Sequence, residues 1–435
     1  HDALPIYKQK YYQLNAKKMK RLFLSMMAMA AITTTLTLTS CGSDDDGNDT
    51  PDGASILAAD GKTLMGNLTG KQTLEEGEYI LGGTVIIENG GELTIPAGTM
   101  IKATKGFSSY ILVAQGGKLY ANGTSSQPVT FTSGEATKKA GDWGGIILNG
   151  KAPISGAGAE GTNTANAEIN NAYKYGGSDR ADNSGALTYV NILYAGARNT
   201  ADIEHNGLTL NGVGNGTKIQ NVYVLESADD AIEFFGGTVN VTNLLAVNPD
   251  DDMFDFTQGY KGTLSNCYGI WEDGYTSTEE DPRGVEADGN LDGNGVDHVG
   301  QSDFIIDGMT IVNNTVGGNT TTGQKNAMDD VIKVRRGATA TIKNTLVAST
   351  SADALKAKDL VDATDSKGGG TVTINITISS FSYTNEKVVD YVDKTNPDKN
   401  VVGQGTITLT NPSASNAGAN TSVFAWTNYS FPTLN

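Results

Sequence analysis

Several residue types are scarce in this 435-residue chain, and each scarcity narrows what the protein can be. Lys and Arg together number 31 against 49 Asp and Glu, which gives a formal net charge of −18. Such a chain repels phosphate backbones, so nucleic acid is a poor partner and cations are better ones. Leu-rich helical stretches are also scarce, whereas Gly is frequent at 54 residues, so we expect an all-β fold.

Cysteine is restricted to two positions, Cys41 and Cys267. Cys41 follows an export signal over residues 19–40, in which a Lys-Arg pair precedes an apolar, Thr-rich run. Residues 38–42, Leu-Thr-Ser-Cys-Gly, resemble the lipobox of bacterial lipoproteins, whose cysteine is acylated after cleavage. The resemblance implies lipidation at Cys41, which leaves Cys267 without a partner for an internal disulfide. A transmembrane helix is the alternative, but the many Thr and the acidic flank oppose it.

The segments on either side of this signal are not expected to pack. Residues 1–18 precede a plausible start at Met19, and we interpret them as a mis-assigned upstream leader. Residues 41–54 are acidic and polar, as a solvated tether would be. An acidic run directly behind the lipidated cysteine resembles the surface-export signal of Bacteroidetes lipoproteins. That resemblance implies a partner in the outer membrane, reached through the lipid anchor, and a location on its outer face.

Internal repeats decide the predicted fold, a single domain over residues 55–435. Several segments share an Asn in the same place, with apolar residues two positions before it and two and four positions after it. A period of two indicates strands with one buried face. The Asn column comprises Asn191, Asn221, Asn243, Asn266 and Asn344, with Asp307 in the equivalent place.

A second register repeats at the same interval of about 22 residues, for example at Asp229-Asp230-Ala231-Ile232 and Asp251-Asp252-Met253-Phe254. A repeat this short holds two strands and their turns but no crossover helix, so the chain must coil. Crossovers between parallel strands are right-handed, and we therefore predict a right-handed parallel β-helix. Stacked Asn amides would donate to one rung and accept from the next, which forms an asparagine ladder.

The N-terminal part follows the same logic and carries a family resemblance. The segments 141–150, 194–197, 207–214 and 229–240 resemble a group of Bacteroidetes surface lipoproteins with a right-handed parallel β-helix of pectate-lyase-like architecture. The resemblance covers roughly residues 55–300 and implies a fold and a location but no established activity. The tail near 424–426 is expected to cap the open end of the coil, because an unprotected β-edge invites aggregation.

Two loop insertions are predicted, at 273–300 and 313–325, and such insertions often carry function. Residues 288–297 alternate oxygen-bearing side chains with Gly, as a short loop needs to wrap calcium, and they resemble the start of an EF-hand loop. Val299 stands where that pattern has a bidentate Glu, so Asp297 or Glu286 would complete the shell. A flexible turn cluster is the alternative. The predicted calcium ligands are Asp288, Asn290, Asp292, Asn294 and Asp297.

Paired aspartates offer an enzymatic alternative. Asp229, Asp230, Asp251 and Asp252 lie one rung apart, and pectin-degrading hydrolases of β-helix fold carry catalytic acids on neighbouring rungs. The Asn-Thr-Asp and Gly-His-Gly motifs of polygalacturonases are missing, however. Asp residues at turns also commonly cap backbone N–H groups.

Two further classes remain. A lyase would need a uronate held by calcium and a basic residue, for which Arg198, Lys333, Arg335 and Arg336 are available. A binding surface could instead stack sugar rings on aromatic side chains, unless these side chains are packed. The aromatic candidates are Trp143, Tyr260, Trp271 and Tyr275.

The favoured interpretation is a non-catalytic surface lipoprotein that contacts glycans, host molecules or neighbouring envelope components. The alternative is a hydrolase or lyase acting on acidic polysaccharides. A groove that gathers Asp229 to Asp252 with a basic residue would favour the enzyme.

Overall fold

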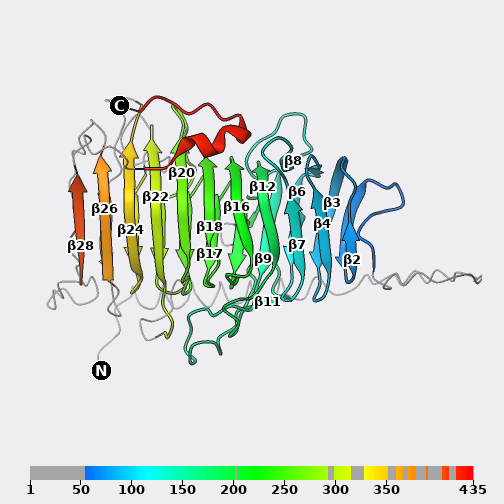
Figure 1. Cartoon of the computed structure of the whole chain (residues 1–435), viewed down its shortest axis with the longest axis horizontal. Coiled ribbons are helices and arrows are strands. Elements are labelled where there is room, and N and C mark those ends of the chain that lie inside the picture. Colours follow the sequence, from blue (N-terminus) through cyan, green and yellow to red (C-terminus); the bar gives the residue numbers. More distant parts are fainter. Residues whose placement is uncertain are drawn as a thin grey trace, which may run out of the picture. The chain divides into compact units, whose positions relative to one another are not determined.

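The computed structural model describes residues 54–200, 203–291, 298–314, 328–350, 359–365, 371–378, 388–389, 404–410 and 418–434. Nearly all strands in these ranges join one parallel sheet that winds into a right-handed β-helix (Figure 1). The predicted fold class is therefore confirmed. No helix in the described part of the chain is long and apolar enough to span a membrane.

Each rung of the solenoid contributes to three strips of this sheet, which we call sheets A, B and C. In the first rungs, separate strands form sheets B and C, while β1 and β3 run from sheet C into sheet A. These strands are β1 (Thr63–Leu68), β2 (Lys71–Thr73), β3 (Glu78–Ile87), β4 (Glu92–Pro96), β5 (Met100–Ala103), β7 (Lys118–Asn122) and β8 (Val129–Ser133).

From β12 onward, one long bent strand supplies both sheet B and sheet C, because β12 pairs with β7 along its first half and with β8 along its second. The long strands are β12 (Gly185–Leu193), β16 (Lys218–Leu225), β18 (Val241–Val247), β20 (Thr263–Trp271), β22 (Asp303–Asn313), β24 (Thr339–Ala348), β26 (Thr371–Ile378) and β28 (Gln404–Thr410).

Beyond β1 and β3, the strands of sheet A alternate in the sequence with those of sheets B and C. They are β6 (Gly106–Val113), β9 (Trp143–Asn149), β15 (Leu208–Asn211), β17 (Ile232–Phe235), β19 (Phe254–Thr257), β21 (Val285–Asp288), β23 (Asp330–Arg335), β25 (Asp359–Asp365) and β27 (Val388–Val389). The predicted loop 273–300 therefore contains a strand of the coil, β21, which pairs with β19 and β23. The prediction of one uninterrupted loop there is wrong. Most of the other predicted loop, 313–325, lies outside the described residues.

The corner between sheets B and C explains the asparagine repeat. Asn221, Asn243, Asn266 and Asn344 have φ of 58°, 59°, 54° and 53°, the left-handed region that Asn tolerates better than most residues. Asn243 Nδ2 donates to Asn221 Oδ1 at 2.7 Å, and Asn266 Nδ2 donates to Asn243 Oδ1 at 2.8 Å. The asparagine ladder is thus confirmed at these rungs.

Two positions assigned to the column lie outside the corner register. Strand pairing aligns Asn191 with Tyr223 and Asp307 with Ser265. Asn191 is therefore not a ladder residue, whereas Asp307 still takes part, because its Oδ1 accepts a hydrogen bond from Asn344 Nδ2 at 2.7 Å. The left-handed corner is occupied instead by Tyr189 and Gly308 in those rungs, with φ of 51° and 76°.

The left-handed corner also inverts the inward and outward alternation along each long strand. In β16, Ile219 points inward before the corner, but Val222 and Val224 point inward after it. Tyr223 therefore lies on the outer face, where it belongs to a separate apolar cluster. A constant period of two across the corner was the wrong assumption.

Replacing Asn243 with alanine should lower the free energy of unfolding by about 1 to 3 kcal/mol, because neighbouring amides lose partners and a non-Gly residue must keep a positive φ. Glycine at the same position removes only the amide, so Asn243→Gly should cost less than Asn243→Ala. Urea unfolding of both variants measures the difference. If both variants had the same free energy of unfolding as the wild type, the asparagine ladder would not stabilise the fold.

The C-terminal tail, residues 418–434, does not cap the end of the coil as predicted. It carries the 3₁₀ helix η1 (Thr421–Thr427) and lies across the outer face of sheet C, beside β16 and β18 (Figure 1). The Asn420 backbone N–H donates to Asn266 Oδ1 at 2.6 Å, and the rings of Trp426 and Tyr189 are 5.4 Å apart. The tail binds this face because the inverted alternation turns apolar side chains outward there. We call it the strap.

One further insertion, residues 150–184, was not predicted. It carries the two-residue strands β10 (Ala165–Asn166) and β11 (Lys174–Tyr175), which pair with each other (Figure 1). Its side chains Ile169 and Tyr173 pack on the outer face of sheet A. Beyond it, β13 (Arg198–Thr200) and β14 (Ile203–Glu204) form a second small hairpin.

Candidate functional site

The outer face of sheet A changes from apolar to charged along the coil. One column of aligned residues on this outer face runs from strand to neighbouring strand. It begins with three aliphatic residues and continues with Thr and then charged residues. In order these are Ile86, Leu112, Ile147, Thr209, Glu233, Asp255, Glu286, Lys333 and Asp362. Aliphatic side chains bind the 150–184 insertion, whereas the charged part needs partners of opposite charge or a ligand.

The paired aspartates precede sheet A at the turn into each strand. Asp230 Oδ1 accepts a hydrogen bond from the Asp252 backbone N–H at 2.8 Å, and Asn206 Oδ1 accepts one from the Asp230 N–H at 3.2 Å. Asp230 and Asp252 are both buried. At Asp230, the side chain therefore caps a backbone N–H group, which was the structural alternative to a catalytic role.

Two acidic groups form around these turns. Carboxylate oxygens of Asp229, Asp230 and Asp251 lie within 4.8 Å of one another, and so do those of Asp230, Glu233 and Asp255. Carboxylates this close can share a proton or hold a cation. Glu233 and Asp255 were not among the predicted site residues, although both stand at the outward position of their strands.

Burial raises the pKa of these carboxyls. It raises the pKa of Asp251 to about 8, with further repulsion from Glu279, and that of Asp255 to about 6. Asp252 Oδ1 is buried without a hydrogen-bond partner among the described residues. The cluster therefore favours protonated carboxyls or a bound cation near neutral pH.

Arg198 lies at one side of this cluster. Its guanidinium is 3.6 Å from Asp250 and 4.0 Å from Asp229, and it also pairs with Glu279. A groove with Asp229 to Asp252 and a basic residue was the arrangement expected of an enzyme, and part of that arrangement is present. His205, by contrast, is buried, and burial lowers its pKa to about 4, so it stays neutral.

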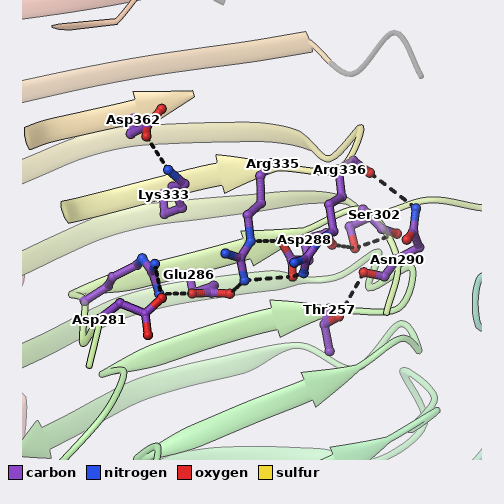
Figure 2. A network of polar contacts seen from close by, with 12 residues as sticks. Thr257, Asp281, Glu286, Asp288, Asn290, Ser302, Lys333, Arg335, Arg336 and Asp362 are labelled. Carbon is purple, nitrogen blue, oxygen red and sulfur yellow. Dashed lines mark hydrogen bonds and ion pairs between the residues drawn. The ribbon is translucent and has the colours of Figure 1, made fainter. Parts of the chain in front are cut away.

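A buried ion network continues along sheet A beyond the aspartates (Figure 2). Arg283 is 2.7 Å from Asp281, pairs with Glu286 and lies 3.6 Å from Asp330. Arg283 occupies the place on its rung that Asp252 has one rung earlier, as the pairing of Phe254 with Val285 shows. Positive charge thus follows negative charge along the stack.

The other basic candidates for a lyase are also paired (Figure 2). Lys333 contacts Asp362, and Arg335 contacts both Glu286 and Asp288. Burial, with Arg336 nearby, lowers the pKa of Arg335 to about 10. Arg336 also contacts Asp288, so Lys333, Arg335 and Arg336 each have a carboxylate partner.

The predicted calcium loop is only partly described. Asp288 ends β21 and pairs with Arg335 at 2.6 Å and also with Arg336, and Asn290 is fully buried. Asp292, Asn294 and Asp297 lie outside the described residues. Calcium binding at 288–297 stays a prediction. A cation bound there would contact an Asp288 carboxylate that is already ion-paired with two arginines.

If this loop binds calcium, calcium at about a hundred times its dissociation constant should add about 2.7 kcal/mol to the free energy of unfolding. The measurement is thermal melting with calcium, with magnesium and with chelator. The double variant Asp292→Ala, Asp297→Ala should lose the response, and it spares the ion pairs of Asp288. A wild-type melt that chelator leaves unchanged would refute the site.

A cavity of about 210 Å³ lies where the apolar and charged parts of sheet A meet. Sheet A forms its floor, while the 150–184 insertion, β14 and the segment before residue 292 form its walls. Its lining comprises Ile147, Asn166, Ala167, Glu168, Ile169, Tyr175, Glu204, Asn206, Thr209, Asn211, Phe235 and Leu291. No spacing in the sequence predicts this cavity, because its walls come from segments far apart in the chain.

The pocket combines an apolar wall with hydrogen-bond acceptors. The rings of Tyr175 and Phe235 meet edge to face with centroids 6.3 Å apart, and Tyr175 OH donates to Gln258 Oε1 at 2.5 Å. Asn211 donates to Asn149 Oδ1 at 2.8 Å, while its own Oδ1 is buried without a partner among the described residues. An unsatisfied buried acceptor is costly unless a ligand or water supplies a donor.

The aromatic residues predicted to stack on sugars are mostly inside the fold. Trp143, Tyr260 and Trp271 are fully buried, and each donates a hydrogen bond to a backbone carbonyl. Tyr275 is half-buried and contacts Asp250. The proposal of an exterior aromatic platform is wrong for the three buried residues, since their rings fill the core and corners of the coil.

Comparison with known proteins agrees with this architecture. The family model described as a pectate-lyase-like β-helix domain matches residues 66–430, which include sheet A, the pocket and most of the strap. No curated protein and no solved structure matches the chain.

Proposed function

We propose that this chain, which belongs to the pectate-lyase-like β-helix family, is a non-catalytic binding protein that holds a glycan at the outer face of sheet A. The observation that supports this most is the pocket beneath the 150–184 insertion, with its apolar wall and its acceptors. A shared fold does not define an activity, so the proposal rests on the site.

The pocket's chemistry suits a sugar ring. Sugars present C–H faces that pack on rings such as Tyr175 and Phe235, and hydroxyls that donate to side-chain oxygens such as those of the lining residue Glu168. The cavity is smaller than pockets for drug-sized ligands. One sugar unit of a longer glycan is therefore the fitting occupant.

We also propose that the protein is exported and lipid-anchored at Cys41, on the outer face of an outer membrane. The support is the lipobox-like sequence and the acidic tether behind it. Changing Cys41→Ala removes the single proposed acylation site, so the variant should leave the membrane fraction. Retention of that variant in the membrane fraction would contradict the anchor.

A hydrolase or lyase acting on acidic polysaccharides is the second candidate, favoured by the proximity of Asp229, Asp230 and Asp251 to Arg198. Against it, Asp230 already caps a backbone N–H, and Asp251 Oδ1 is buried. Glycoside hydrolysis needs two carboxyls that reach the scissile bond.

A polysaccharide panel separates the two functions. The purified mature chain is scored for binding and for new reducing or unsaturated ends. Binding without products supports the binding protein, and a bulky Leu291→Trp substitution at the pocket should abolish it. Products that disappear in Asp251→Asn, but persist in Leu291→Trp, would replace this proposal with the enzyme.

A further inference from the structure

We propose that Lys333 and Asp362 become joined by an amide bond between their side chains, an intramolecular crosslink that ties two neighbouring rungs of sheet A together. The inference is independent of what the pocket binds. It is carried by the contact between these two side chains, by their burial, and by the position of a third buried carboxyl, that of Asp330.

The strand pairing of the coil holds the two reacting side chains together. Lys333 on β23 is aligned with Asp362 on β25 in the parallel pairing of these strands. Both side chains therefore leave the same face of sheet A, one rung apart, and Lys333 Nζ contacts Asp362 Oδ2 (Figure 2). Groups that are well oriented within one molecule can react as if one of them were present at about 10⁵ M.

The contact is shielded from water, although Lys333 stands at the outward position of its strand. Lys333 is 7% exposed and Asp362 is 4% exposed. A buried ammonium and a buried carboxylate have both lost their hydration, and their mutual attraction repays this cost only in part. Proton transfer between them gives an amine and a carboxylic acid, which are the neutral forms that burial favours. These two neutral groups are the reactants of amide formation.

Asp330 supplies the carboxyl that can move protons in such a reaction. It is fully buried, and its Oδ2 lies 3.5 Å from Lys333 Nζ and 3.6 Å from Arg283 Nε. Neither of its oxygens has a hydrogen-bond partner among the described residues, which is unusual for a buried carboxyl. Burial raises the pKa of Asp330 to about 6, so this carboxyl can accept and release a proton near neutral pH.

The condensation balances without any added reactant. The Lys333 ammonium first gives one proton to the Asp362 carboxylate, and the lone pair on Nζ then attacks Asp362 Cγ to form the N–C bond. Asp330 takes a second proton from this nitrogen and delivers it to the hydroxyl on Cγ. The C–O bond to that hydroxyl breaks and one water molecule leaves. The product is a neutral secondary amide, and Asp330 returns to its starting state.

A second pair of Lys and Asp offers an internal control within the same chain. Lys343 Nζ lies 3.0 Å from Asp307 Oδ2, but their side chains are 45% and 37% exposed. Water hydrates both charges there, so the ion pair has no reason to become neutral. We therefore expect Lys343 and Asp307 to stay unlinked.

The experiment is tryptic digestion of the purified, denatured protein followed by mass spectrometry. We expect peptides 326–335 and 359–367 to appear as one species whose mass is the sum of both peptides less one water molecule. Trypsin should not cleave after Lys333, because an acylated lysine is not its substrate. Lys343 and Asp307 should be recovered in unlinked peptides from the same digest.

Fragmentation of the linked species should place the bond on Asp362, and Asp362→Ala should restore cleavage after Lys333. Asp330→Asn keeps both reacting groups but removes the proton carrier, so freshly purified variant should contain roughly tenfold less linked species. Circular dichroism checks that the variant keeps its β-sheet signal.

The wild-type digest alone can overturn the proposal. Complete cleavage after Lys333, with peptide 359–367 recovered unlinked, would show that Lys333 and Asp362 form an ion pair and no covalent bond. A link from Lys333 to any other carboxyl would overturn the assignment. An undiminished yield of linked species in folded Asp330→Asn would refute the part given to Asp330.

Discussion

Replacing Arg283 with methionine is expected to lower the free energy of unfolding by about 3 to 5 kcal/mol, because removal of one partner from a buried ion network leaves the others uncompensated. Arg283 is only 4% exposed, and its guanidinium forms ion pairs with Asp281, Glu286 and Asp330. Methionine fills similar space without charge. Chemical denaturation of both proteins measures the change.

The matched control is Arg180→Met. Arg180 pairs with Glu160, but its side chain is 52% exposed, and exposed ion pairs contribute about 0 to 1 kcal/mol. A loss in Arg283→Met no larger than in Arg180→Met would mean that the sheet A network does not stabilise the fold.

The Arg283 effect should also depend on pH in a defined direction. Burial raises the pKa of Asp330 to about 6 and of Asp251 to about 8, while Arg283 counteracts the rise in both. A carboxyl whose pKa is higher in the folded than in the unfolded protein contributes most to the free energy of unfolding below its unfolded-state pKa. That contribution is lost as the pH rises through its folded-state pKa. The wild type should thus lose stability between about pH 4 and pH 8. The deficit of Arg283→Met should be larger at pH 8.5 than at pH 5.

Only those residues of the coil that recur at the repeat interval could be predicted from the sequence. Asn221, Asn243 and Asn266 repeat at fixed spacing, so the ladder and the coil could be read directly. Arg283 and Glu286 occupy the same rung positions as Asp252 and Asp255. Because Arg283 has the opposite charge to Asp252, the sequence pattern does not repeat at that position. The strand β21 was therefore mistaken for part of a loop.

The pocket could not be predicted for a different reason. Its floor residues Thr209 and Phe235 belong to the repeat, but Glu168 and Tyr175 come from an insertion that has no period. Which part of sheet A the insertion covers is set by the packing of Ile169 and Tyr173 on an outward aliphatic column. Such contacts between distant segments leave no spacing signal in one sequence.

The strap was misplaced for a third reason, since the outward apolar face that binds it arises only from the left-handed corners. Tyr223, two places after Asn221, was taken as a core residue, and a tail with Phe and Trp then had no partner except an open end. With the alternation inverted, Tyr223, Leu245 and Tyr268 form an outer cluster with the strap. A terminal cap would have left this face exposed to solvent.

Replacing Phe424 with alanine is the second change with a large expected effect, about 3 to 5 kcal/mol, because this strap residue is fully buried in the outer cluster on sheet C. The strap is a short segment on the surface of the coil, so the loss should appear as local detachment. Detachment uncovers the apolar outer face of sheet C, which should bind an apolar dye and promote self-association.

The measurements are dye fluorescence, limited proteolysis after residue 417 and far-ultraviolet circular dichroism. We expect dye binding and cleavage to rise while the β-sheet signal persists, since Phe424 belongs to the outer cluster and not to the core of the coil. Ser430→Ala, at an exposed position of the same strap, is the control and should match the wild type. Unchanged dye binding and protease resistance in Phe424→Ala would show that binding of the strap to sheet C does not depend on this side chain. Loss of the β-sheet signal together with the strap would show that strap and coil unfold as one cooperative unit, which would refute local detachment.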